Sequence, residues 1–403
     1  MREFFDKRSQ LWRRPEILLF LMAASATICF AVWQALLNNF SIERAAFTGV
    51  EMGILQSLRE VPGFLSFTVV FLLLFVREQP LALISLLLLG IGTAITGMFP
   101  AIIGLYCTTV LMSVGFHYFE AVHTSLALQW VDKDRAPETL GRLISVKAAA
   151  SIVTYGAVWL AFDFMGFDYV WVYLLGGAAA IALLVFCWAA YPRYPERVVQ
   201  NKNMVLRPRY WLYYALTFMS GARRQIFIVF AGFLMVEKFG YSVSAIAALY
   251  LVNAAINVWM APRIGRLIGR WGERKALIFE YIGLVGVFTA YAFVENATIA
   301  AGFYILDHMF FALAIAMKTY FQKIADPADI ASTAGVSFTI SHIAAVVIPA
   351  AFGVLWLTSP AAVFLAGAAM AAMSLLMALN VPHNPSRGNE VLVGRTRAAV
   401  PAE

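Results

Sequence analysis

Apolar runs long enough to cross a lipid bilayer recur along the chain from residue 16 to residue 380. A helix crossing a hydrocarbon core of roughly 30 Å needs about 20 apolar residues, whereas a β-barrel would need short segments of alternating polarity. Only 13% of the 403 residues are charged, against about 25% in soluble proteins, so the chain has too little polar surface to face water all round. We therefore predict an all-α membrane protein of about twelve transmembrane helices. The predicted spans are residues 16–39, 50–76, 81–99, 101–130, 143–162, 169–191, 210–236, 242–262, 275–294, 298–322, 333–357 and 360–380.

Positive charge is distributed unevenly between the predicted loops. With the N-terminus inside, the inner segments carry 23 Lys and Arg residues, whereas the outer loops carry only Arg44 and Lys238. Cytoplasmic loops of membrane proteins are enriched in Lys and Arg. We therefore expect a multi-pass protein of the cell inner (plasma) membrane with both termini cytoplasmic. The net charge of +7 then reflects topology, and we expect no nucleic-acid partner.

The two halves of the chain match at a constant offset of 194 residues. Gly141 and Gly335, each after a polar loop, are separated by this distance, and so are the pairs Thr48/Ser242 and Arg59/Asn253. Transporters are commonly built from internal repeats. The match predicts an N-terminal six-helix bundle (1–191), a linker (192–209), a C-terminal six-helix bundle (210–380) and a cytoplasmic tail (381–403).

The segment between the eighth and ninth predicted spans is rich in glycine and arginine. It resembles the cytoplasmic loop signature of the major facilitator superfamily, a glycine followed by Asp-Arg, an aromatic residue, a second glycine and a basic run. The matching residues are Gly265, Arg270, Gly272, Arg274 and Lys275. Gly269 stands at the acidic position of the signature, and Glu273 stands at one of its basic positions. The resemblance implies two six-helix bundles and a loop that lets two helices approach closely and latches the domains by charge pairs.

Two features that the superfamily's proton-coupled drug exporters carry are missing from this sequence. The fourth predicted span has no arginine before its loop, and the fifth has no Gly-Pro motif. The loop signature is also absent between the second and third spans, where the link is only residues 77–80. These departures argue against a standard drug/proton antiporter.

Several basic and amide side chains lie within the spans and are candidates for solute binding. An arginine at the bilayer centre costs roughly 3 kcal/mol on insertion scales, so such a group normally faces a wet cavity or an opposite charge. Because adjacent helical residues are about 100° apart, only one arginine of the pair in the seventh span can point squarely at a cavity. The other is expected to pair with a neighbouring helix, and Asp307 lies at a comparable depth. The candidates are Arg59, Lys147, Arg223, Arg224, Asn253 and Asn257.

Carboxylates and histidines inside the spans are candidates for proton coupling, because burial of a carboxylate beside histidines favours proton uptake near neutral pH. In the fourth span, His117, Glu120 and His123 lie close together by helical spacing. A zinc site from these three is a weaker alternative because the geometry is poor for a closed site, and we expect no metal. The proton-coupling candidates are Glu60, His117, Glu120, His123, Asp307 and His308.

These patterns favour a secondary transporter that works by alternating access, with a small anionic or zwitterionic organic solute as its cargo, because guanidinium groups suit carboxylate and phosphate. Protons are a candidate coupling ion for symport. Two alternatives stay open: export of drugs or amphiphilic compounds, and a transporter-like sensor or assembly partner that does not transport. No nucleophile–base pair, metal-ligand set or phosphate loop has usable spacing, so we expect no enzyme and no cofactor. The expected partners are the solute, the lipid bilayer and protons, and we expect a monomer.

Overall fold

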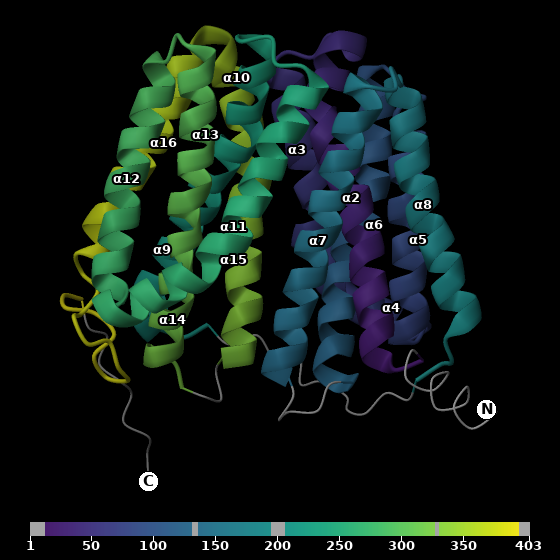
Figure 1. Ribbon diagram of the computed structural model, residues 1–403. Coiled ribbons are helices and arrows are strands. Elements are labelled where there is room, and N and C mark those ends of the chain that lie inside the picture. Colours follow the sequence, from purple (N-terminus) through teal and green to yellow (C-terminus); the bar gives the residue numbers. More distant parts are fainter. Residues whose placement is uncertain (1–12, 131–135, 195–205, 327–329, 395–403) are drawn as a thin grey trace. The chain divides into compact units, whose positions relative to one another are not determined.

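The structure is a computed structural model that describes residues 13–130, 136–194, 206–326 and 330–394, and its regular elements are helices (Figure 1). The first half contains α2 (Pro15–Ala45), α3 (Gly49–Phe64), η1 (Leu65–Thr68), α4 (Val69–Leu72), α5 (Glu78–Thr96), α6 (Ile102–Trp130), α7 (Ala136–Asp163) and α8 (Tyr169–Ala190). The second half contains η3 (Pro208–Tyr210), α9 (Trp211–Ile226), η4 (Phe227–Ala231), α10 (Gly232–Glu237), α11 (Val243–Trp271), α12 (Glu273–Phe293), α13 (Ala297–Phe311), η5 (Ala312–Ala314), α14 (Ile315–Ile324), α15 (Ile330–Thr358) and α16 (Pro360–Ala378).

Within the described residues, eleven helical segments are long and apolar enough to cross a membrane. The second predicted span, 50–76, is not a continuous helix: α3 ends at Phe64 and is followed by the 3₁₀ turn η1 and the short α4. Pro62 lies near the end of α3. Proline lacks the N–H that continues a helix and clashes with the carbonyl one turn back, which explains why the regular helix ends there.

Three other helices continue beyond the predicted membrane spans. For α7 and α11 the apolar stretches themselves, Arg142–Asp163 and Val243–Met260, agree with the prediction. The first helix runs on past residue 39 and stops at Ala46, which has a left-handed backbone with φ of +52°. α7 begins seven residues before the predicted span, at Ala136. α11 continues to Trp271, so residues 263–271 are helical and Gly272 alone joins α11 to α12. Gly272 has a φ of +78°, a conformation that glycine adopts without steric cost.

The chain forms two compact units. Unit 1 consists of residues 1–47, 58–200 and 241–254, and unit 2 consists of residues 48–57, 201–240 and 255–403. The predicted bundle boundaries stay predictions; in the structure, residues 48–57 lie in unit 2 and residues 241–254 in unit 1. The linker and tail boundaries stay predictions, since 195–205 and 395–403 lie outside the described residues.

In unit 1, α5 packs against α6 and α8, and α2 packs against α7 and α8. Glycines allow the closest of these approaches. A β-carbon on Gly92 would lie 2.6 Å from the backbone nitrogen of Met112, and one on Gly90 would lie 2.6 Å from Ile181. Gly90 and Gly92 are therefore packing sites between α5 and its neighbours α8 and α6.

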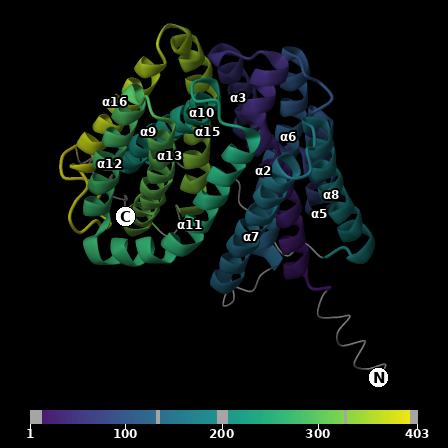
Figure 2. The same cartoon turned by 45° about the horizontal axis from the view of Figure 1, so that its top comes forward.

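In unit 2, α12 packs against α16, and α9 packs against α15 and α16 (Figures 1 and 2). The first half of α3 belongs here because Gly49 and Gly53, one turn apart, let it approach α15 closely. A β-carbon on Gly53 would lie 2.2 Å from the carbonyl oxygen of Pro349, and one on Gly49 would overlap the ring of Trp356.

Candidate functional site

Arg223 lies in the interior of unit 2 with only 1% of its surface exposed. One guanidinium nitrogen lies 3.4 Å from Glu280 Oε1 on α12, and another donates to Ser374 Oγ on α16 at 3.1 Å. The guanidinium also lies over the ring of Tyr281, 4.9 Å from its centroid. Arg223 therefore ties α9 to α12 and α16. Its ion-pair partner is Glu280 and not Asp307, which the depth of the two residues had favoured.

Arg224 is exposed, in contrast to its neighbour, and it lines a cavity of about 220 Å³ within unit 2. Its guanidinium lies 5.1 Å from the ring centroid of Phe311. The structure thus divides the arginine pair between a buried ion pair and a cavity wall. The residues that line the cavity are Arg223, Arg224, Phe227, Ile228, Asn257, Leu284, Phe288, Asp307, His308 and Phe311.

Both helices that supply the cavity's charged residues are interrupted beside it. α9 ends at Ile226, and a π-helical turn starts at Phe227. α13 ends at Phe311, and the 3₁₀ turn η5 follows. π-bulges and broken membrane helices occur frequently at functional sites, because their backbone groups are partly released from the regular helix. The interruptions therefore mark this cavity as the candidate site of unit 2.

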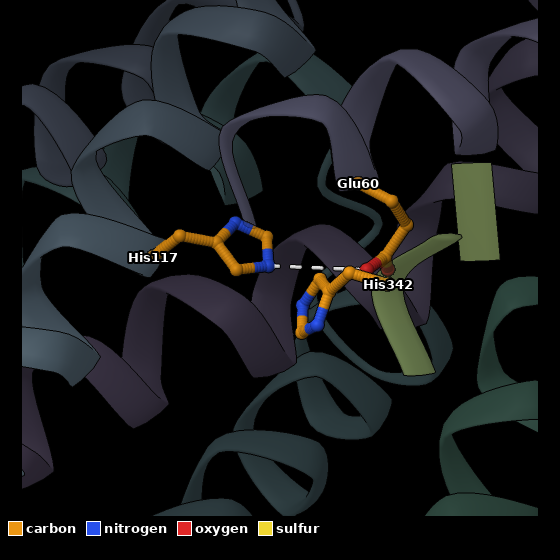
Figure 3. Close-up of side chains that lie close together, drawn as sticks. All are labelled: Glu60, His117 and His342. Atoms are coloured by element: carbon orange, nitrogen blue, oxygen red, sulfur yellow. Dashed lines mark ion pairs between the residues drawn. The ribbon is translucent and has the colours of Figure 1, made fainter. Parts of the chain in front are cut away.

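In unit 1, Arg59 and Glu60 form an ion pair with each other, and both are buried. Arg59 Nε donates to Glu60 Oε1 at 3.1 Å, and the guanidinium lies 5.7 Å from the ring centroid of Trp33. His117 on α6 points at Glu60, with 3.9 Å between Nε2 and Oε2 (Figure 3). Ser113 links the same groups, because its hydroxyl donates to the Arg59 carbonyl and lies 3.0 Å from His117 Nδ1. Arg59 thus has a neutralising carboxylate beside it.

The other two proton-coupling candidates of α6, Glu120 and His123, contact different partners. Glu120 accepts from Lys147 Nζ of α7 at 2.7 Å, and both side chains are about one-third exposed. His123 is buried and its Nε2 lies 3.0 Å from the carbonyl oxygen of Leu19 on α2. Glu120 and His123 are near enough to interact electrostatically. His117 points at Glu60 instead, and the three residues do not form a group of converging ligand atoms among the described residues.

The two asparagines of α11 also differ. Asn257 is exposed and lines the cavity of unit 2. Asn253 belongs to unit 1 and is 4% exposed, and neither side-chain polar atom has a hydrogen-bond partner among the described residues. A buried amide without partners costs about 1–3 kcal/mol, which marks Asn253 as a candidate contact for a polar solute.

Three comparisons place this architecture among known proteins. The sequence model of the Major Facilitator Superfamily matches residues 17–349. The chain belongs to the major facilitator superfamily. It is therefore a polytopic membrane protein of a transporter family, with a lipid bilayer as its surroundings and small molecules as its substrates. No match was found among curated protein sequences.

Solved superfamily structures share the fold at low sequence identity. The nucleoside transporter NupG is 12% identical, with a TM-score of 0.73 over 91% of this chain and 98% of that one. A bacterial homologue of the human lysosomal transporter Spinster, described as inward-facing and occupied, is 15% identical, with a TM-score of 0.68 over 90% of this chain and 94% of that one. At these identities the likeness establishes the fold alone.

Glu273, the residue that departs from the superfamily's loop signature, has a structural explanation. It lies in the first turn of α12 with a buried side chain and accepts from Lys323 Nζ of α14 at 2.7 Å. Unit 1 has an equivalent contact: Glu78, in the first turn of α5, accepts from Gln129 of α6 at 2.7 Å and from Ser125 at 3.0 Å. In both units of this superfamily member, a glutamate in the first turn of one helix thus contacts a side chain of another helix, even though only the second half carries the signature.

Replacing Lys323 with alanine is expected to lower the free energy of unfolding by about 1 kcal/mol, the usual upper value for a partly exposed ion pair. Thermal unfolding of the purified protein in detergent would measure the loss. Lys318→Ala, at an exposed position on the same helix, is the matched control and should change little. An equal effect of the two substitutions would contradict a specific role for the Glu273–Lys323 contact.

Sequence reasoning missed Glu280, the most consequential partner in this superfamily member's second half. It stands among apolar residues in α12, and the nearest charged residue along the chain is Lys275. The signal was its depth: Glu280 lies a third of the way along a helix whose central residues are otherwise apolar. An isolated carboxylate in a membrane helix requires a partner, and Arg223 of α9 meets that requirement.

Proposed function

We propose that this protein is a secondary active transporter that moves a small anionic or zwitterionic organic solute by alternating access, with the unit 2 cavity as part of its solute site. The observation that carries the proposal is Arg224, an arginine within a membrane helix that lines a cavity while its neighbour Arg223 is held in a buried ion pair. Asn257 and His308 add polar groups to the same cavity. A guanidinium in such a position suits a carboxylate or phosphate group.

The size of the cavity supports a small solute over a large amphiphile. Sites for drug-sized ligands usually have volumes of about 300–1,000 Å³, whereas this cavity measures about 220 Å³. Half of its lining residues are polar or charged, which suits a polar solute. We accordingly place small polar solutes ahead of drug or lipid export, and we expect no enzymatic reaction.

Proton coupling is the second part of the proposal, and several carboxylates are candidates to carry the proton. Glu60 lies between Arg59 and His117, and Glu120 pairs with Lys147. Asp307 and His308 line the unit 2 cavity. Groups that exchange one charged partner for another during a conformational cycle are suited to taking up and releasing a proton. We also propose that the protein resides in the inner membrane with both termini cytoplasmic, as the distribution of positive charge predicts.

Replacing Arg224 with glutamine is expected to reduce solute transport at least tenfold while leaving the protein folded. A charge-assisted hydrogen bond contributes about 1.5–3 kcal/mol, and every 1.4 kcal/mol corresponds to a tenfold change. Uptake would be measured in proteoliposomes with a panel of carboxylates, phosphate esters, amino acids and uridine, with and without an imposed proton gradient. Uridine is the uncharged member of the panel.

Arg44→Gln is the matched control for this experiment. Arg44 is also a helical arginine, but its side chain is 49% exposed and its partner is the exposed Asp168 at 2.8 Å, so its loss should leave uptake unchanged. Unchanged transport in Arg224→Gln, or efficient transport of uridine with no charged solute transported, would contradict an anionic or zwitterionic cargo. Uptake that ignores the proton gradient would contradict proton coupling alone.

A further inference from the structure

The wall of the unit 2 cavity contains side chains of both charge types. Arg223, Arg224 and Asp307 line it, and Glu280, outside the lining, pairs with Arg223. Inside a membrane protein, any additional net charge is costly because the surroundings have a low dielectric constant. A solute of zero net charge therefore fits this environment better than an anion, provided that it offers groups that the two charge types can bind.

These four residues do not contribute equally to the cavity. The Arg223 guanidinium is already bound by Glu280 and Ser374, and both Arg223 and Glu280 are 1% exposed. Arg224 and Asp307 then provide the cavity with one positive and one negative group. Asp307 is 5% exposed, and it shares the positive charge of the Arg223 guanidinium with Glu280, which makes the closer contact to that arginine. A buried carboxylate of this kind needs a cationic partner.

Aromatic rings form much of the remaining wall. Phe227, Phe288 and Phe311 line the cavity. Phe227 lies at the π-turn with its ring centroid 6.2 Å from that of Phe288 and 5.7 Å from that of His308. Rings at centroid separations of 4.5–7 Å interact favourably in offset or edge-to-face arrangements. The wall therefore suits a flat aromatic group better than a hydroxylated or aliphatic one.

We propose that the solute is an aromatic α-amino acid or a close analogue, a zwitterion whose carboxylate binds Arg224, whose ammonium binds Asp307 and whose ring lies among the three phenylalanines. The cavity volume of about 220 Å³ equals the volume of about seven water molecules in the liquid. The cavity therefore accepts a small solute. This inference rests on the proposed transport function and narrows its substrate class. It also gives Asp307 a direct role in binding.

The test is binding to the purified wild-type protein by scintillation proximity with labelled L-phenylalanine, L-tyrosine, L-tryptophan and L-histidine. Competitors would be 3-phenylpropionate, which lacks the ammonium, phenethylamine, which lacks the carboxylate, and L-alanine, which lacks the ring. At least one aromatic amino acid should bind, and each competitor should bind at least tenfold more weakly than that amino acid. Absence of binding by all four amino acids, or equal affinity for 3-phenylpropionate, would overturn the inference.

Two variants assign the charged groups. In Asp307→Asn, the amino acid and 3-phenylpropionate should bind with about equal affinity, because the variant no longer attracts the ammonium. In Arg224→Gln, the preference over phenethylamine should fall in the same way. If Asp307→Asn keeps the full preference for the ammonium but loses proton-driven accumulation, Asp307 carries a proton and the inference is wrong.

The proposed transport function and the narrower inference fail differently in these assays. Suppose that 3-phenylpropionate or another carboxylate is transported in an Arg224-dependent way and that an ammonium group is not recognised. This result would contradict a zwitterionic substrate but would agree with a transporter of anionic solutes. Loss of dependence on Arg224 across the whole panel would overturn both.

Discussion

Replacing Arg223 with methionine should destabilise unit 2 by about 3–5 kcal/mol, the range observed when one partner of a buried ion pair is removed. The substitution leaves Glu280 in the interior with 1% exposure and without its ionic partner. Glu280 Oε2 already lacks a hydrogen-bond partner among the described residues, so nothing nearby is placed to compensate. The expected result is a strongly lowered unfolding temperature in detergent, or loss of the monodisperse protein after solubilisation.

The double substitution Arg223→Met with Glu280→Leu distinguishes the ion pair from simple loss of packing. Replacing both partners of a buried pair by apolar residues is often neutral or stabilising. Ser374, which also bonds Arg223, keeps its own bond to the Met370 carbonyl oxygen at 2.9 Å, so it is not left unsatisfied. The double variant should therefore regain most of the stability that the single variant loses. If Arg223→Met alone is as stable as the wild type, the buried pair does not hold α9 to α12.

Replacing Gly115 with alanine is the second substitution with a large expected effect. The new β-carbon would lie 2.4 Å from the backbone nitrogen of Leu89 and 2.5 Å from the backbone carbonyl oxygen of Ser85. Backbone atoms within a helix cannot rotate away as side chains do, so α5 and α6 must separate. Overpacking of an interior typically costs about 1–3 kcal/mol, and we expect the upper end of this range because the contact involves two main-chain atoms.

Gly156→Ala is the matched control, since it adds the same methyl group to a helical glycine of the same unit. A β-carbon at Gly156 meets nothing within 4 Å, and alanine is favoured over glycine in a helix by roughly 0.5–1 kcal/mol. This variant should match or slightly exceed the wild type in thermal unfolding experiments. Similar unfolding temperatures for the two alanine variants would show that α5 and α6 do not approach as closely as the structure places them.

The sequence predicted the crossing helices well, because their signal is local. A run of about 20 apolar residues must be helical in a bilayer, since every backbone polar group has to be satisfied within the segment. The helix boundaries differ from the predicted spans where apolar and helix-breaking or polar residues are mixed. Pro62 interrupts the second span, and polar residues from 263 to 271 continue α11 beyond the apolar run.

The candidate site was predicted only in part. The depth of Arg223, Arg224 and Asp307 could be counted along each helix, and the division of the two arginines followed from the angle between adjacent helical residues. The partner of Arg223 could not be counted in the same way. Glu280 lies on another helix 57 residues away, and the rotation of α12 about its axis depends on packing that no local pattern encodes.

The sequence by itself thus determined that this protein is helical, that it belongs in a membrane and that charged groups lie deep within its spans. Each of these follows from hydrophobicity, charge and spacing along one segment. Only the tertiary structure decided that Arg223 is held by Glu280, that Arg224 lines a cavity with Asp307, and that Glu273 is tied to Lys323. These contacts join helices far apart in the sequence, and the choice of partner is made by the packing of glycines and aromatic rings between the helices.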